Sequence, residues 1–253
     1  MKRLKIDDFK RFETVLCDLD GVVWREEEVI WENVEGLKRL KEMGKKLVFL
    51  TNNSTKTPEY YTERLRDLGL YPDKVITSSV VAADYLFKMG IKRVFVIGEN
   101  GLIEPLKSKG ITTDEVNPEA VVVGLDRNFS YEKLKKAANF VYRGLTFIAT
   151  NMDAHIKKSD EILPGAGSLV SAISFASGRE PDAVMGKPNP YIYEFVGNVE
   201  SAIVMGDRLD TDILGGNRLN IPTVLVLTGV HTLEDVERLK IFPTYFVENL
   251  SKI

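Results

Sequence analysis

Short runs of four or five apolar residues recur along the chain, and they limit its fold more than any other feature. The clearest, AVVV at 120–123 and AIVM at 202–205, show no alternation of apolar and polar residues. A strand of this kind is buried on both faces, as in a parallel sheet covered by helices. We expect strands at 14–17, 47–50, 93–97, 120–123, 146–149, 202–205 and 223–227.

Longer stretches with apolar residues three and four apart separate these runs and predict helices. In residues 31–43, for example, Val34, Leu37, Leu40 and Met43 recur at this spacing, which puts them on one face of a helix. We expect helices at 31–43, 58–68, 79–89, 131–142, 168–176, 190–196 and 210–219. Alternation of strands and helices predicts an α/β protein whose parallel sheets are covered by helices.

Composition excludes several classes of protein. The chain has 253 residues, of which 44% are apolar and 28% charged, so a sizeable core is expected and wholesale disorder is not. Its net charge is −3 without a concentrated basic segment, which argues against a nucleic-acid partner. No apolar run reaches the ~18 residues of a membrane span. One cysteine, Cys17, allows no internal disulfide and fits a cytoplasmic protein.

Acidic residues follow the first expected strand. The sequence Asp18-Leu19-Asp20-Gly21 comes directly after TVLC. In open parallel sheets ligands bind beyond the carboxyl ends of the strands, so both carboxylates are candidates for a site. Two neighbouring carboxylates repel each other, and a divalent cation would compensate that repulsion. The alternative is an acidic surface turn.

Two further polar segments could bind an anion. Thr51-Asn52-Asn53-Ser54 follows LVFL and offers hydroxyls, amides and backbone N–H groups. Lys187, in GKPNP, precedes an expected helix whose N-terminus favours anions. The alternatives are a polar turn before a helix and a solvated lysine.

A second acidic group follows AIVM, in the sequence GDRLDTD. The spacing does not fit a calcium EF-hand loop, because apolar residues occupy ligand positions. Asp210 is expected to be the N-cap of the next helix. Asp207 and Asp212 then remain as candidate metal ligands.

The order DLDG, FLTNNS, GKP and GDRLDTDILGG resembles the phosphatase branch of the haloacid dehalogenase (HAD) superfamily, and within it the NagD-like, para-nitrophenyl phosphatase-like group. The resemblance covers nearly the whole chain. It implies a Rossmann-like core and a phosphatase that forms an aspartyl-phosphate. The matching residues are Asp18 as nucleophile and Asp20 as general acid/base. Thr51, Asn52 and Lys187 match the phosphate-binding positions.

The resemblance also implies Mg²⁺ as cofactor. The ligands would be the Asp18 side chain, the Asp20 backbone carbonyl and Asp207, with Asp212 in the outer shell through water. The second aspartate argues against a dehalogenase, which has no leaving alkoxide to protonate.

The spacing of the motifs leaves room for an inserted domain. Between Thr51 and Lys187 lie 135 residues, about 100 more than the core needs, with their own alternation of strands and helices. We expect a discontinuous core at 1–79 and 180–253 and an α/β cap at 80–179, of the kind that closes over a site. Only a small flap at 22–30, with Trp24 near the site, fits between Gly21 and Leu50.

A cap of that size implies a small phosphorylated metabolite as substrate. Sugar, glycolate, pyridoxal and nucleotide phosphates remain open, with para-nitrophenyl phosphate as an artificial substrate. We expect polar loops of the cap, at 126–128 and 151–153, to face the substrate. Related proteins often pair through the cap, which makes a homodimer an expectation. The alternatives to a phosphatase are a phosphoryl transferase or mutase, and a non-catalytic phosphate-binding module.

Overall fold

The computed structural model describes residues 1–158 and 161–253, which form two compact units. The first unit contains residues 1–51, 59–76 and 187–253, and the second contains 52–58 and 77–186. The range of 80–179 expected for the cap lies within the second unit, which also contains 52–58, 77–79 and 180–186. The chain therefore leaves the first unit after Thr51, returns to it for residues 59–76, leaves again after Ile76 and returns at Lys187.

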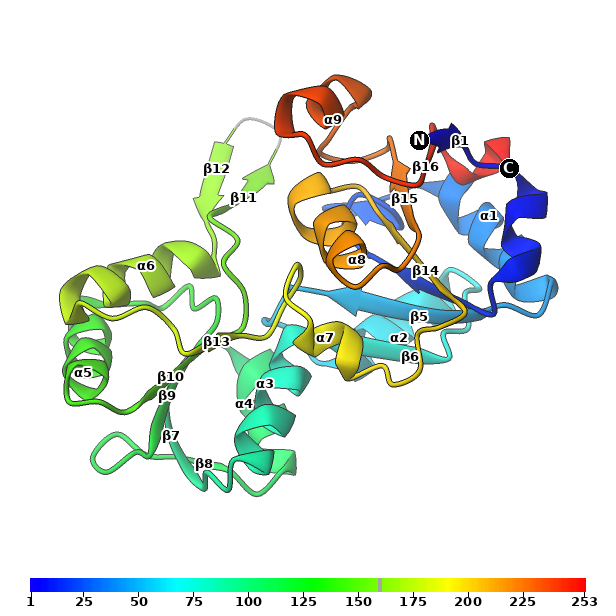
Figure 1. The fold of residues 1–253 in the computed structure, drawn as a ribbon. Helices are drawn as coiled ribbons and strands as arrows, with labels where there is room; N and C mark the ends of the chain where they lie inside the picture. Colours follow the sequence, from blue (N-terminus) through cyan, green and yellow to red (C-terminus); the bar gives the residue numbers. More distant parts are fainter. Residues whose placement is uncertain (159–160) are drawn as a thin grey trace. The chain divides into compact units, whose positions relative to one another are not determined.

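A seven-stranded sheet forms the centre of the first unit (Figure 1). Its strands, in spatial order, are β1 (Lys2–Arg3), β16 (Tyr245–Val247), β15 (Thr223–Val226), β14 (Ala202–Gly206), β2 (Thr14–Cys17), β5 (Lys46–Thr51) and β6 (Lys74–Thr77). The pairings from β1 to β5 are all parallel. The carboxyl ends of β14, β2 and β5 therefore lie next to one another at one edge of the sheet.

Helices pack on this sheet because its strands are apolar on both faces. Val15 and Cys17 on β2 belong to the same buried cluster as Leu37 and Leu40 of α1. The helices of this unit are α1 (Trp31–Glu42), α2 (Pro58–Asp67), α7 (Tyr191–Glu194), α8 (Leu214–Arg218) and α9 (Leu233–Leu239). Short 3₁₀ helices span Ile6–Arg11 and Leu250–Lys252, and a π-helical turn spans Leu209–Ile213. A hairpin of β3 (Trp24–Arg25) and β4 (Glu28–Val29) follows β2.

The second unit has its own five-stranded parallel sheet. Its spatial order is β13 (Ala183–Val184), β10 (Thr146–Ala149), β9 (Ala120–Val123), β7 (Arg93–Ile97) and β8 (Thr112–Thr113). Figure 1 shows α5 (Tyr131–Tyr142) and α6 (Ala166–Ser177) on one face of this sheet, with α3 (Ser78–Lys88) and α4 (Asn100–Ser108) on the other. An antiparallel pair, β11 (His155–Lys158) and β12 (Glu161–Pro164), precedes α6.

The predicted fold class is confirmed, since parallel sheets with covering helices make up both units. All seven apolar runs form strands. The helix expected at 210–219 is wrong in form, because a π-helical turn takes its first residues and only Leu214–Arg218 is α-helical. The helix expected at 190–196 is shorter, at Tyr191–Glu194. Among the described residues, no helix is both long enough and apolar enough to cross a membrane.

Candidate active site

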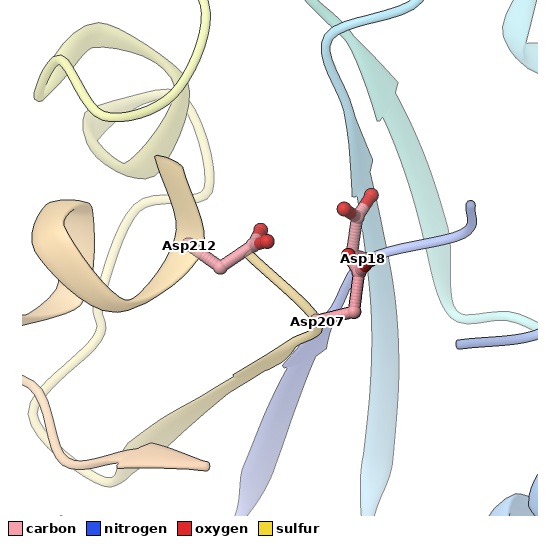
Figure 2. A group of neighbouring side chains, drawn as sticks. All are labelled: Asp18, Asp207 and Asp212. Atoms are coloured by element: carbon pink, nitrogen blue, oxygen red, sulfur yellow. The ribbon is translucent and has the colours of Figure 1, made fainter. Parts of the chain in front are cut away.

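Three buried carboxylates meet at the carboxyl edge of the first unit's sheet. Asp18 follows β2 and Asp207 follows β14, and the Asp18 N–H donates to the Met205 carbonyl at 2.8 Å, which keeps the two strand ends in register. Figure 2 shows Asp212 pointing toward them from the next turn of the chain. One carboxylate oxygen from each of Asp18, Asp207 and Asp212 lies within 4.8 Å of the others. The structure therefore brings together the first and last acidic motifs.

Lys187 lies between two of these carboxylates. Its Nζ is 2.8 Å from Asp18 Oδ1 and 2.7 Å from Asp212 Oδ1, and it donates to the Leu50 carbonyl at 3.2 Å. The side chain is only 3% exposed, so it is not a solvated lysine. Asp18 Oδ1 also accepts the Leu19 N–H at 2.7 Å, so the Asp18 carboxylate is held from two sides.

The site carries more negative charge than its lysine can balance. When all of them are ionised, three carboxylates and one ammonium together carry a charge of −2. Burial raises the pKa of Asp18, and the nearby Asp212 raises it further. The same two causes raise the pKa of Asp207 to about 7. Burial alone would lower the pKa of Lys187, but the charges of Asp18 and Asp212 outweigh it and raise that pKa. A divalent cation would restore neutrality and return both aspartates to the ionised form.

One oxygen of Asp207 is held by the backbone, while the other has no hydrogen-bond partner. Oδ2 accepts the Val230 N–H at 2.7 Å, whereas Oδ1 is buried without a hydrogen bond. A buried carboxylate oxygen in this state is costly unless something binds it. The unpartnered Asp207 Oδ1 and the uncompensated negative charge are both what a metal-binding site requires. The three carboxylates therefore suit a metal ion that takes carboxylate ligands.

Asp212 reaches the site because the chain makes a wider turn than an α-helix after β14. The Ile213 N–H donates to the Arg208 carbonyl five residues back, at 3.2 Å, and such π turns are frequent at functional sites. The expectation that Asp210 is the N-cap is wrong. Its carboxylate instead pairs with the Arg208 guanidinium at 2.8 Å and makes no cap bond, so it stays out of the site.

The remaining candidates are placed at or beside these strand ends. Thr51 ends β5, is 1% exposed, and directly follows the Leu50 carbonyl that Lys187 contacts. Asn52 belongs to the second unit, where its carbonyl accepts the Asn151 side-chain amide at 2.8 Å. Asp20 is exposed, and its carboxylate accepts the indole N–H of Trp24 rather than joining the cluster of three.

Models of known families match most of the chain. Residues 15–112 match the haloacid dehalogenase-like hydrolases, and residues 184–253 match a second HAD-hydrolase-like model. An acid sugar phosphatase of Staphylococcus aureus is 37% identical over 252 residues, covering 96% of this chain and 97% of that protein. The chain belongs to the HAD superfamily.

Solved structures place this HAD protein among the NagD-like phosphatases, as the motifs predict. A p-nitrophenyl phosphatase from Archaeoglobus fulgidus superposes with a TM-score of 0.90 at 36% identity, covering 95% of this chain and 97% of that one. NagD from Escherichia coli K-12 superposes with a TM-score of 0.87 at 34% identity, covering 96% and 98%. The recognition of a HAD phosphatase from the four motifs is confirmed.

Sequence reasoning missed the segment that holds the last motif of this HAD phosphatase in place. Val230 and His231 follow β15, and their N–H groups donate to the Asp207 side chain and carbonyl. A Cβ on Gly229 would overlap the Asp207 carboxylate, and one on Gly206 would overlap Asp212. The only signal in the sequence is a glycine after an apolar strand, which is too common to single out a functional residue.

Proposed function

We propose that this protein hydrolyses phosphate monoesters of small metabolites, using Mg²⁺ and an aspartyl-phosphate intermediate on Asp18. The observation that carries the proposal is the buried Lys187 ammonium, which contacts Asp18 Oδ1 and Asp212 Oδ1 at 2.8 and 2.7 Å. An ammonium here favours the ionised, nucleophilic form of Asp18 and so opposes burial and the charge of Asp212, which raise the pKa of that carboxyl group.

Asp18, Asp207 and Asp212 would hold the metal, with Asp212 acting through a bound water and the Asp20 carbonyl as a further ligand. The unpartnered Asp207 Oδ1 and the charge of −2 support this assignment. Oxygen ligands of this kind, with room for waters, suit Mg²⁺. The ion would supply charge neutralisation for the phosphate and its transition state.

Two side chains of the protein, Asp18 and Asp20, would make the covalent bond to phosphorus and transfer the protons. Asp18 attacks phosphorus, and the ester oxygen leaves with a proton from Asp20. A water molecule then attacks the aspartyl-phosphate while Asp20 takes its proton, which releases phosphate and restores both carboxyl groups. The covalent intermediate divides one difficult displacement into two easier ones. An acid/base in this position typically contributes about 10²–10⁴-fold.

The phosphate oxygens would be bound by the residues around Lys187. Thr51 offers a hydroxyl at the end of β5, and Asn52 offers the next backbone N–H. Lys187 would neutralise one negative charge of the phosphate at the moment when Asp18 approaches it. These contacts are strongest for the transition state, in which charge spreads over the equatorial oxygens.

The substrate class is tested by phosphate release from a panel of compounds. The panel holds sugar, glycolate, pyridoxal and nucleotide phosphates together with para-nitrophenyl phosphate. We expect release with Mg²⁺ and none with EDTA, and the names of the relatives favour sugar phosphates and para-nitrophenyl phosphate. Transfer of phosphate between positions of a sugar without release would support the mutase alternative. Absence of any turnover would favour a binding module. A cap-mediated homodimer and a cytoplasmic location stay predictions.

The metal assignment predicts the behaviour of Asp207→Asn. An amide lacks the charge and one of the two carboxylate oxygens, so the Mg²⁺ concentration for half-maximal activity should rise about ten- to a hundredfold. Titration of activity with Mg²⁺ measures this change, and a thermal-shift titration reports binding independently. Asp210→Asn is the matched control, since Asp210 lies three residues further along the same motif but pairs with Arg208. An unchanged Mg²⁺ requirement in Asp207→Asn would remove Asp207 from the ligand set.

A further inference from the structure

The short hairpin after the first motif brings a tryptophan back onto the second aspartate. Gly21 has a φ of 78°, and its N–H donates to the Trp24 carbonyl at 2.7 Å, which closes the turn. The Trp24 indole Nε1–H then donates to Asp20 Oδ1 at 3.0 Å. The residue that the proposed mechanism uses as acid and base is therefore in direct contact with this hairpin.

Asp20 is exposed, so packing alone does not fix the orientation of its carboxyl group. A directed hydrogen bond to one oxygen selects a single orientation of the carboxyl group. Because a protonated oxygen is a weaker acceptor, the indole N–H on Oδ1 favours Oδ2 as the oxygen that carries the acid proton. A fixed indole donor would thereby influence both where the acid proton lies and in which direction it points.

The indole can act as a fixed donor because Tyr61 and Arg64 pack against its ring and hold it in place. Trp24 is 1% exposed and stacks on Tyr61 with ring centroids 6.3 Å apart and planes 12° from parallel. The Arg64 guanidinium carbon lies 4.1 Å from the centroid of the indole ring, within the range of a cation–π contact. Both partners come from α2, so a helix of the same unit sets the position of the ring.

Arg64 also anchors the loop of the hairpin. Its Nη2 donates to the Glu26 carbonyl at 3.1 Å and contacts the Glu27 carboxylate at 3.2 Å. Glu26 occupies the left-handed region with a φ of 54°, which is unusual for a residue other than glycine. A single side chain from α2 thus holds both the hairpin tip and the indole, which leaves the Nε1–H little freedom to move.

We propose that Trp24 is a positioning residue for the general acid/base, and that its indole N–H orients Asp20 toward the leaving oxygen. This inference rests on the proposed function, because it needs Asp20 to protonate a leaving group. The proposal predicts that removal of the indole N–H lowers the rate of leaving-group release. The loss should be larger for leaving groups of higher pKa, which depend more on protonation.

The test is a leaving-group series of aryl phosphates in which the phenol becomes steadily less acidic. The release of phenol in the first turnover is measured by rapid quench for wild type and Trp24→Phe at saturating Mg²⁺. We expect a roughly ten- to hundredfold loss for phenyl phosphate and a much smaller loss for para-nitrophenyl phosphate, whose phenolate leaves without a proton. The plot of log rate against leaving-group pKa should therefore become steeper.

Phenylalanine is smaller than tryptophan, so a second variant separates shape from hydrogen bonding. Incorporation of β-(3-benzothienyl)alanine at position 24 retains the bicyclic ring and replaces the N–H by sulfur. The same steepening is expected there. A loss of equal size across the series in this variant, or no loss at all, would overturn the positioning role.

Two controls complete the experiment. Trp31→Phe changes the other tryptophan, which is 53% exposed at the start of α1, and should leave the slope unchanged. Asp20→Asn should steepen the slope at least as much as Trp24→Phe. If Asp20→Asn retains the wild-type slope, Asp20 is not the acid and both proposals fail. If Asp20→Asn steepens the slope but neither Trp24 variant does, only the inference about Trp24 fails.

Discussion

Asp18→Asn is expected to reduce turnover at least roughly a thousandfold on every substrate that the wild type accepts. The amide of asparagine cannot accept the phosphoryl group, so the covalent route is lost and only positioning by the rest of the site remains. Phosphate release at saturating Mg²⁺ measures the loss. Brief incubation with radiolabelled substrate followed by acid quench should trap label on wild type and none on the variant.

The stability of this variant separates a lost nucleophile from a lost fold. Burial and the neighbouring Asp212 raise the pKa of Asp18, so its charge is unfavourable in the metal-free protein. A neutral side chain should therefore leave the free energy of unfolding in EDTA equal to or higher than that of wild type. Asp67→Asn, an exposed aspartate at the end of α2, serves as control for both assays. Wild-type rates, or label trapped on Asp18→Asn, would contradict the nucleophile assignment.

Lys187→Met is expected to affect both catalysis and stability. The buried ammonium is the cation between Asp18 and Asp212, and its removal leaves two carboxylates facing each other away from water. Breaking a buried ion pair in this way costs about 3–5 kcal/mol, so urea denaturation in EDTA should show a loss of that order. Turnover should fall roughly a hundredfold or more, because the phosphate also loses its cation.

Mg²⁺ should distinguish this role from a merely structural one. A divalent cation supplies part of the missing charge, so it should stabilise Lys187→Met more than it stabilises wild type. Lys41→Met is the matched control, because Lys41 pairs with Asp73 where both side chains are more than a third exposed. Such surface pairs contribute about 0–1 kcal/mol. Wild-type turnover and unchanged stability in Lys187→Met would leave the lysine without a function in the site.

Local patterns were enough to predict seven of the strands, because a buried parallel strand with a continuous apolar run is recognisable from its own residues; β6 and β16 of the first unit's sheet were not predicted. TVLC, AVVV and AIVM are strands in the structure with little or no change of bounds. The helix α4 was not predicted, because Gly101 and Pro105 lie inside it and both are poor helix formers. The helix forms because the burial of Leu102 and Leu106 stabilises it by more than Gly101 and Pro105 destabilise it.

The amino-acid sequence was enough to show which chemical groups stand at the strand ends, and the ordered motifs identified the family. Which of these groups meet depends on the three-dimensional fold. Asp18 and Lys187 are 169 positions apart, and their 2.8 Å contact depends on the order of the strands rather than on any local pattern. Two hydrogen bonds likewise come from chain segments that fold back onto the motifs. The Val230 N–H donates to the Asp207 carboxylate, and the Trp24 indole N–H donates to the Asp20 carboxylate. The sequence shows a tryptophan in the flap, but it does not show which acceptor the indole N–H or a backbone N–H will bind, because packing in three dimensions chooses those partners.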